Sequence, residues 1–247
     1  MLHYDKLLNI LDTVDSTNNY AMQKVYAGMA KHGEAYFSAF QNQGKGQRGK
    51  DWLTEQGKNI ALSVIVSPFA LHNMEQFYLS AAVALGCHDF FSVYAGDETS
   101  IKWPNDIYWR DRKAAGILIE NSFNGTEWKW SVIGIGVNIN QTVFGETLHN
   151  PVSLQQISGK TFDLLLLAKE LLHCVMCRID ELLNGGNKAH MIVEYNRFLY
   201  KKNQPARLKK GAMVFDTTIK EVDSNGRLVT EDSFERRFEF GEVSWVL

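Results

Sequence analysis

Apolar residues recur at the 3.6-residue spacing of an α-helix in four segments of the chain. The first follows a polar cluster, and its helix is expected to begin at Ser16 or Thr17, since hydroxyl side chains are favoured N-caps. Two further segments cover 74–94 and 188–200. The clearest is 161–183, where one apolar stripe ends at an Asn-Gly-Gly turn. We expect this helix to lie against the core.

Runs rich in β-branched and aromatic residues alternate with these helical segments and predict strands. The segment 41–57 interrupts them with four glycines, several cations and almost no apolar residue, and is expected to be a loop. The close spacing of the later runs implies two hairpins. The expected strands cover 35–40, 59–66, 100–103, 107–109, 116–120 and 128–139.

After Pro205 the pattern changes to short strands with a turn at 223–226. This change predicts a larger unit over residues 1–202 and a smaller one over 203–247, and the smaller is of a size that suits a β-barrel packed on its neighbour. The predicted fold class is α+β, with a mixed or antiparallel sheet covered by helices.

Composition narrows the class of protein further. The 247 residues are 45% hydrophobic and 22% charged, which excludes disordered and collagen-like chains. With 26 Lys and Arg against 28 Asp and Glu, a nucleic-acid partner would need a local basic patch. Three cysteines are too few for a disulfide framework, and neither a signal peptide nor a membrane-spanning stretch is readable. We therefore expect a cytoplasmic protein without a membrane partner.

The glycine-rich loop is the strongest local signal for chemistry. Its glycines allow backbone N–H groups to approach an anion, and Lys45, Arg48 and Lys50 add positive charge. It is not a Walker A loop, because Asp51 stands where a Mg²⁺-binding hydroxyl is required. The alternative interpretation is a flexible, solvated loop.

Two further motifs are ambiguous on their residues alone. Asn105 and Asp106 follow Pro104 at a strand end, which suits either a ligand contact or a simple Asx turn. Lys113 leads into an apolar strand, either as a surface charge or as a point charge over a reacting oxygen.

The Cys174-x-x-Cys177 spacing lies within a helical stripe without a second pair, so core or surface cysteines are expected there instead of a metal site.

Five motifs in the same order resemble those of biotin protein ligases. The first begins at Asp15, so we expect no DNA-binding domain ahead of it and no DNA partner. The resemblance implies a catalytic domain like that of class II aminoacyl-tRNA synthetases, followed by a small SH3-like β-barrel that matches the end of the chain. The motifs are Asp15-Ser16-Thr17-Asn18, the loop 44–49 with Trp52, Lys102-Trp103-Pro104-Asn105-Asp106, Lys113 before Ala115-Gly116-Ile117-Leu118, and Gly134-Ile135-Gly136-Val137-Asn138.

The resemblance implies ATP-dependent and Mg²⁺-dependent activation of biotin as biotinyl-5′-AMP, then transfer to one lysine of a biotin carboxyl carrier protein domain, by a monomer or homodimer. The implied catalytic residues are Lys113, Arg48, Lys102 and Asp106, with Asp106 also a Mg²⁺ ligand. The implied biotin-binding residues are Ser16, Thr17, Asn18, Gln41, Gly44, Lys45, Lys113, Gly116 and Gly136. The implied nucleotide-binding residues are Lys45, Arg48, Trp52, Asn105 and Asn138.

The glycine-rich loop departs from the family pattern at Lys45 and Gln47, where arginines are usual, and the loss of charge at Gln47 leads us to expect a weaker hold on the adenylate. Two alternative functions fit the sequence less well. A lipoate or octanoate ligase or transferase is disfavoured because its Arg-Arg-x-x-Gly-Gly-Gly stretch is missing. A non-enzymatic binding module would use basic residues of the C-terminal unit, but those cations are not interleaved with aromatic residues.

Overall fold

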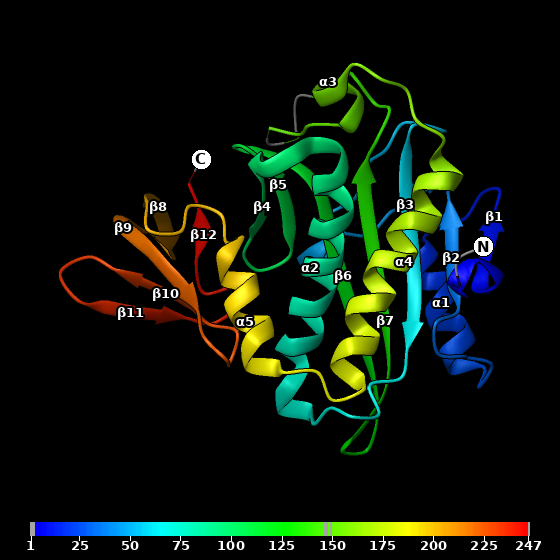
Figure 1. The fold of residues 1–247 in the computed structure, drawn as a ribbon, viewed down its shortest axis with the longest axis horizontal. Helices are drawn as coiled ribbons and strands as arrows, with labels where there is room; N and C mark the ends of the chain where they lie inside the picture. The colour runs from blue at the N-terminus through cyan, green and yellow to red at the C-terminus, as the bar shows by residue number, and fades with distance from the viewer. Residues whose placement is uncertain (1–2, 146–147, 149, 247) are drawn as a thin grey trace.

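The computed structural model describes residues 3–145, 148 and 150–246. A seven-stranded sheet in the order β1-β2-β3-β7-β6-β5-β4 forms its centre (Figure 1). β1 and β2 run parallel and the other five neighbouring pairs are antiparallel, which confirms the predicted mixed sheet. The strands are β1 (Leu8–Leu11), β2 (Ala35–Ser38), β3 (Asn59–Val66), β4 (Thr99–Lys102), β5 (Asp106–Trp109), β6 (Arg112–Asn124) and β7 (Glu127–Asn138).

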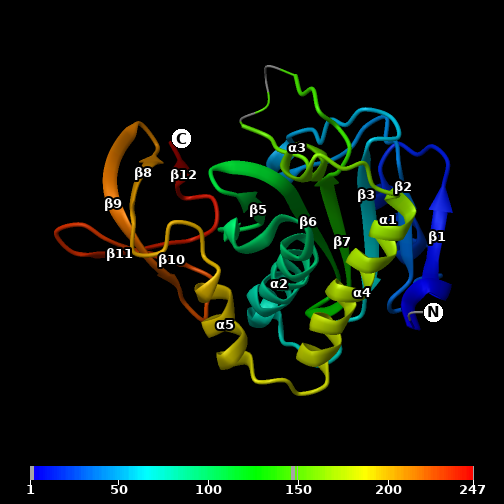
Figure 2. The same cartoon turned by 45° about the horizontal axis from the view of Figure 1, so that its top comes forward.

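Helices cover both faces of this sheet (Figures 1 and 2). The long pair α2 and α4 packs on one face and α1 on the other, while α5 lies beside α2. None of the helices in the described residues has the length and apolar character to span a membrane. The α-helices are α1 (Thr17–Tyr26), α2 (Gln76–Ala95), α3 (Leu154–Ser158), α4 (Leu164–Leu183) and α5 (Lys188–Arg197); the 3₁₀ turns are His3–Leu7, Gln47–Gly49, Asn73–Glu75 and Gly96–Glu98.

Most predicted elements are present, with shifted ends. The predicted helix over 161–183 starts at Leu164, because the Asp163 side chain caps it by accepting two backbone N–H groups. The strand predicted over 116–120 is wrong in length, since β6 runs from Arg112 to Asn124. β1 and α3 were not predicted, and both are short.

Alternation along β7 gives the sheet two different faces. Ile133, Ile135 and Val137 point into the core that α2 and α4 cover. Gly134 and Gly136 occupy the intervening positions, on the face that carries α1. One face is therefore sealed by apolar packing, and the other has glycines where side chains would stand.

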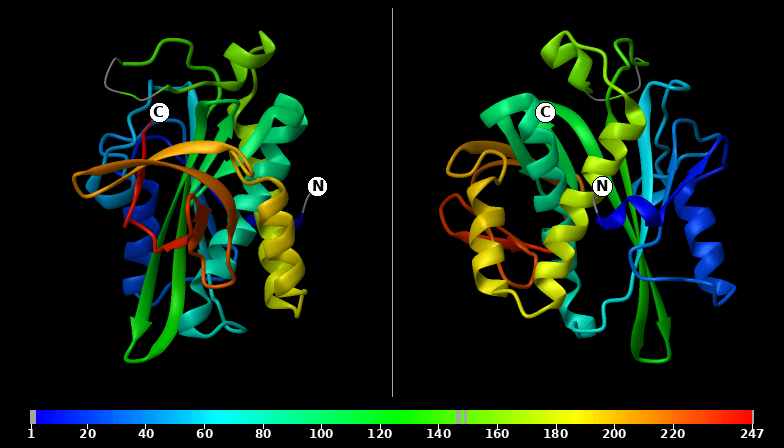
Figure 3. Two further views of the ribbon diagram at one scale, coloured as in Figure 1. Left: turned by 90° about the vertical axis from the view of Figure 1, so that its left-hand side faces the viewer. Right: turned by 45° about the vertical axis from the view of Figure 1, so that its right-hand side comes forward.

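The C-terminal strands form a second, five-stranded antiparallel sheet in the order β11-β10-β9-β8-β12 (Figures 1 and 3). The predicted turn joins β9 to β10, with the Gly226 N–H donating to the Asp223 carbonyl. The buried cluster of the large sheet continues into this unit through residues such as Leu208 and Ile219. The strands are β8 (Pro205–Lys210), β9 (Met213–Val222), β10 (Leu228–Glu231), β11 (Glu235–Phe238) and β12 (Ser244–Trp245).

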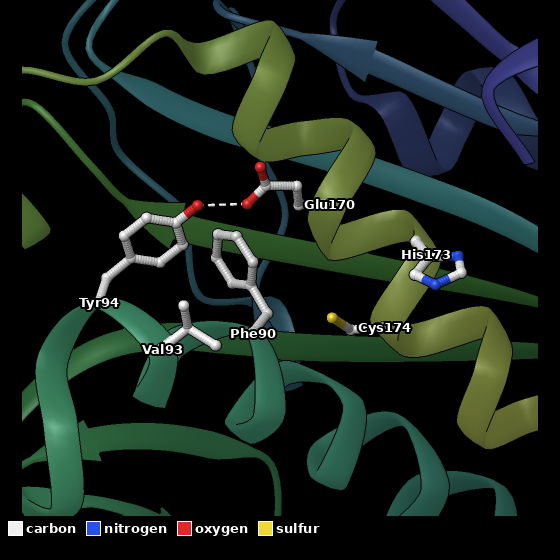
Figure 4. Close-up of a pocket in the computed structure, with 6 residues that line it drawn as sticks. All are labelled: Phe90, Val93, Tyr94, Glu170, His173 and Cys174. Atoms are coloured by element: carbon white, nitrogen blue, oxygen red, sulfur yellow. Dashed lines mark hydrogen bonds between the residues drawn. The ribbon is translucent and has the colours of Figure 1, made fainter. Parts of the chain in front are cut away.

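A small cavity of about 140 Å³ lies between α2 and α4 (Figure 4). Phe90, Val93 and Tyr94 from α2 face Glu170 and Cys174 from α4, and the Tyr94 hydroxyl donates to the Glu170 carboxylate. Because both helices pack on the face opposite α1, the cavity belongs to the helix layer and lies away from the glycine face.

A buried lysine lies where the two sheets meet. The Lys102 Nζ donates to the Tyr108 hydroxyl at 2.9 Å and lies 5.4 Å from the ring centroid of Trp245 in β12. The ring centroids of Tyr108 and Tyr200 lie 4.4 and 6.0 Å away. Burial in this aromatic surround lowers the pKa of Lys102 to about 8.

This lowered pKa predicts how stability responds to pH. An unfolded lysine keeps its proton up to about pH 10.4, so between the two pKa values the unfolded chain binds more protons and the free energy of unfolding rises with pH. Between pH 7.5 and 9.5, wild type should gain roughly 1–2 kcal/mol relative to Lys102→Met in chemical denaturation. The exposed Lys129→Met is the matched control. If the free energy of unfolding changes with pH in the same way for wild type and Lys102→Met, the lowered pKa of Lys102 is refuted.

Candidate active site

An ion pair on the glycine face brings two predicted residues together. Lys113, one residue inside β6, places its Nζ 2.7 Å from Oδ1 of Asp106 in β5. The Lys113 N–H donates to the Asn150 carbonyl, and the Lys113 carbonyl accepts the Val152 N–H. These two hydrogen bonds hold the backbone from which the side chain projects. Both side chains are partly buried, at 31% and 19% exposure, which strengthens the attraction between the charges relative to open solvent.

Gly116 and Gly136 stand directly opposite each other on β6 and β7. The indole ring of Trp52 lies against both: a Cβ at Gly116 would come within 3.1 Å of its Cζ3, and one at Gly136 would collide with the ring. The Lys113 Nζ lies 5.7 Å from the Trp52 ring centroid. Four predicted residues therefore meet here, and the close approach at both glycines is made by the indole ring.

The Trp52 Nε1–H is buried, and no hydrogen-bond partner for it is found among the described residues. A buried donor without a partner costs free energy, so it marks a point where a ligand acceptor would be favourable. Trp52 thus contributes both an apolar surface and a donor to this part of the site.

The glycine-rich loop folds back on itself as a small hairpin. The Trp52 N–H donates to the Gly44 carbonyl at 2.8 Å, and the Gly46 N–H donates to the Lys50 carbonyl at 2.7 Å. A Cβ on Gly44 would collide with the Trp52 backbone, so only glycine allows this closure. The exposed Lys45 side chain projects from the hairpin.

Arg48 reaches the C-terminal unit. Its Nη2 donates to the Gly241 carbonyl at 3.1 Å, and its guanidinium lies 5.4 Å from the ring centroid of Phe240. The loop that carries Trp52 is thereby tied to the second sheet. Lys102, as described above, faces aromatic rings at the same junction between the sheets.

Polar side chains of three segments gather at the start of β6. Gln47 Nε2 and Asn105 Nδ2 both donate to the Ile117 carbonyl, at 3.2 and 2.7 Å. Asn138 Nδ2 donates to the Lys113 carbonyl over a longer 3.4 Å. The loop, the β4–β5 turn and the end of β7 therefore converge on the same stretch of backbone.

A second polar group surrounds the N-terminus of α1. The Thr17 N–H donates to Gln41 Oε1 at 2.8 Å, and Asn18 Nδ2 donates to Glu120 Oε2 at 2.9 Å. Ser16, one of the two predicted N-caps, holds the N-cap position, but its buried side chain makes no capping hydrogen bond. This group lies further along the same face as the glycine pair.

Three residues of this second group were not among the predicted site residues: Ser63, Glu120 and Gly134, although Gly134 opens one of the five motifs. Ser63 Oγ lies 2.6 Å from Asn18 Oδ1, and Gly134 pairs with Ser63 across β3 and β7. A Cβ at Gly134 would collide with the Asn18 amide. Ser63 interrupts an otherwise apolar strand, and that interruption was the signal available in the sequence.

No three His, Cys, Asp or Glu side chains gather into a metal site within residues 3–145, 148 and 150–246. Asp106 lies next to Lys113, so it offers one carboxylate that is already paired. On α4, Cys174 is half-buried and Cys177 is exposed, and Cys177 Sγ lies 3.6 Å from His173 Nε2.

Known ligases are similar to this chain in sequence. The bifunctional ligase/repressor BirA of Escherichia coli is 28% identical over 243 residues, which cover 95% of this chain and 73% of that protein. The biotin--[acetyl-CoA-carboxylase] ligase of Paracoccus denitrificans is 34% identical over 161 residues, 62% of this chain and 65% of that protein.

The fold is similar to that of the biotin protein ligase from Aquifex aeolicus solved in complex with biotin and ATP. The TM-score is 0.81 at 21% identity, over 97% of this chain and 98% of the other. The model of the biotin/lipoate A/B protein ligase family matches residues 10–138, a range that leaves out Asn150 and Val152, which bond to the Lys113 backbone, and Phe240 and Gly241, which contact Arg48. The chain belongs to the biotin/lipoate A/B protein ligase family.

Proposed function

We propose that this chain is an ATP-dependent biotin protein ligase, which activates biotin as biotinyl-5′-AMP and transfers it to a lysine of a biotin carboxyl carrier protein domain. The observation that carries the proposal is the Lys113–Asp106 pair beside the Gly116–Gly136 surface under Trp52. Relatives named as biotin ligases support this reading over lipoate or octanoate transfer.

The first step joins two anions. A biotin carboxylate oxygen attacks the α-phosphorus of ATP, a new O–P bond forms, and pyrophosphate leaves. Lys113 is the cation placed to offset the charge that develops between them. In the second step a neutral lysine amine attacks the anhydride carbonyl and a C–N bond forms; the C–O bond to AMP breaks, AMP leaves with its electrons, and the proton that the nitrogen loses passes to solvent. Asp106 accepts hydrogen bonds near this point and orients either Lys113 or the incoming amine.

We assign the biotin end to the group around α1 and the nucleotide end to the loop and the β4–β5 turn. Ligand entry beside Gly116 and Gly136 requires the Trp52 ring to swing away and return as a wall over the adenine, with its Nε1–H free to donate. The remaining biotin-side residues are Ser16, Thr17, Asn18, Gln41, Gly44 and Lys45, and the remaining nucleotide-side residues are Lys45, Arg48, Asn105 and Asn138.

Mg²⁺ enters this proposal with the ATP phosphates. Mg²⁺ commonly takes one or two protein carboxylates besides phosphate oxygens and water, and Asp106 is the predicted residue of that kind. Bound there, Mg²⁺ would neutralise phosphate charge. Lys102, buried among aromatic rings, keeps a positive charge near Asp106. Of the charged groups around Lys102, the Asp106 carboxylate raises the pKa of the lysine most.

The C-terminal sheet, which we infer to be the SH3-like unit over 203–247, supports the loop through Arg48. We propose that the chain acts as a monomer or homodimer.

Incubation with ATP, Mg²⁺ and one acid at a time tests the function. Biotin should give an adenylate of the mass of biotinyl-5′-AMP, and octanoate and lipoate should give little. Addition of a biotin carboxyl carrier domain should then raise the mass of that domain by one biotinyl group. An octanoyl or lipoyl adenylate as the main product would replace this proposal with the alternative activity.

Lys113→Ala should keep the fold and lower the rate of adenylate formation by roughly 10²–10³, because a cation facing developing charge contributes about that factor. Pyrophosphate release measures the rate, and thermal unfolding checks the fold. Lys129→Ala, an exposed lysine on β7, is the control and should leave the rate unchanged. A Lys113→Ala rate equal to wild type removes Lys113 from the mechanism.

Gln47→Arg tests the departure of the loop from the family pattern. The Gln47 amide donates to a backbone carbonyl at the start of β6, close to where Asn105 donates. An arginine adds a charge-assisted hydrogen bond and should slow the release of preformed biotinyl-5′-AMP by roughly ten-fold or more, with synthesis nearly unchanged. Equal release rates would mean that position 47 does not contact the adenylate.

A further inference from the structure

The β4–β5 turn, which leads into Asp106, is held on one side by β6. It is a three-residue loop over 103–105, closed by Lys102 and Asp106, which lie directly opposite each other on the two strands. The Asn105 carbonyl accepts the Ile117 N–H at 2.9 Å, and the Asn105 side chain donates to the Ile117 carbonyl at 2.7 Å. The position of Asp106 therefore also depends on what holds the other side of the turn.

Trp103 joins that other side to the second sheet. Its indole N–H donates to the Gly226 carbonyl at 2.9 Å, and its own carbonyl accepts the Trp245 indole N–H at 3.2 Å. Gly226 lies in the turn between β9 and β10, and Trp245 lies in β12, on the side of the second sheet that faces β4 and β5 (Figures 1 and 2). Two hydrogen bonds from the second sheet thus hold one residue of the loop.

The two supports of Trp103 are anchored differently. The β9–β10 turn is fixed to α5, because the Asn196 side chain both donates to the Val222 carbonyl, at 2.8 Å, and accepts the Val222 N–H, at 2.7 Å. Trp245 is half-buried and belongs to an edge strand of two residues that pairs with β8. Trp245 is therefore the support that a substitution removes with less disturbance to the fold.

Trp245 also covers the lysine beside Trp103. The Trp245 ring centroid lies 5.4 Å from Lys102 Nζ and 5.5 Å from the ring centroid of Tyr200. Because Lys102 and Asp106 are directly opposite each other, their side chains project from the same face of the sheet. The ring excludes water from a cation on the face that carries the Asp106 carboxylate, which strengthens the attraction between the two charges.

We propose that Trp245 is a positioning residue, which fixes the 103–105 loop through Trp103 and Lys102 and so keeps Asp106 against Lys113. The inference rests on the proposed function, because Asp106 has a role only if the chain transfers the biotinyl group. Lys113 Nζ and Asp106 Oδ1 are 2.7 Å apart, and a displacement of about 1 Å at a reacting centre is enough to slow a step strongly. Trp245 exerts this effect from the second sheet, without contact with a reacting atom.

Single-turnover transfer from preformed biotinyl-5′-AMP to a biotin carboxyl carrier domain is the test. Trp245→Ala removes both the hydrogen bond and the ring, and should lower the transfer rate about ten-fold. The Michaelis constant for biotin should stay within about two-fold of wild type, because the group around α1 is held by other contacts. Trp245→Phe keeps a ring over Lys102 without the N–H, and should recover part of the rate.

A double-mutant cycle with Asp106→Ala separates positioning from general support of the fold. In the Asp106→Ala background, Trp245→Ala should slow transfer by less than about two-fold, because the side chain that it positions is already gone. Losses that multiply, or a Michaelis constant for biotin that rises as much as the transfer rate falls, would give Trp245 a purely structural role and overturn the inference.

Phe234→Ala, an exposed ring between β10 and β11, is the matched control and should leave the transfer rate unchanged. Thermal unfolding checks each variant. If Trp245→Ala does not fold, the same cycle with Trp245→Phe decides: a smaller loss that vanishes in Asp106→Ala supports the inference, and no loss overturns it. A wild type that forms no biotinyl-5′-AMP overturns the proposed function, whereas a wild type that forms and transfers it, with no loss in Trp245→Ala, overturns this inference alone.

Discussion

The lack of side chains at Gly116 of β6 and at Gly134 and Gly136 of β7 is the constraint on which the site depends. A strand turns successive side chains to opposite faces, so Ile133, Ile135 and Val137 seal the helix side while the residues between them face α1. Because Gly134 and Gly136 are those residues, flat groups lie directly on the backbone. The Asn18 amide occupies one such place and the Trp52 indole the other.

The two faces of the large sheet therefore have different roles. The α2–α4 side carries apolar packing that holds the sheet rigid, and Gly86 lets the two helices approach so closely that a Cβ would lie 2.6 Å from the Val175 Cα. On the other side, the glycine face of β6 and β7 is then a fixed surface on which polar groups keep their geometry. Lys113 and Asp106 lie at one end of the glycine face, and Glu120 lies further along β6.

The sequence predicts the helices and the strand positions because their apolar residues recur over ten or more positions, as in α2 and α4. β1 and α3 have four and five residues, too few for a period to be counted. The motif residues Lys113, Asp106, Trp52, Gly116 and Gly136 were predicted individually. That Trp52 lies on the two glycines was not, because it depends on how the loop folds back.

Other contacts had no signal along the chain at all. Asn18 and Glu120 lie 102 residues apart, and Arg48 and Gly241 lie 193 apart. Such pairs arise only when the sheet register and the second sheet are in place. Ser63 differs from these pairs, because a single hydroxyl in a strand expected to be apolar must find a partner, and that was its signal in the sequence.

The glycine-rich loop, which covers the glycine face through Trp52, is held by contacts of very different strength. Arg48 is exposed, and a cation near an exposed ring such as Phe240 contributes only about 0.5–1 kcal/mol. The half-buried Trp52 ring contributes more, because an aromatic side chain buries a large apolar area on the glycines. Opening the loop is therefore limited by exposing Trp52, and not by releasing Arg48. A ligand that replaced the ring with its own apolar surface would remove most of that cost, so the proposed site would couple ligand binding to loop movement through the same two glycines.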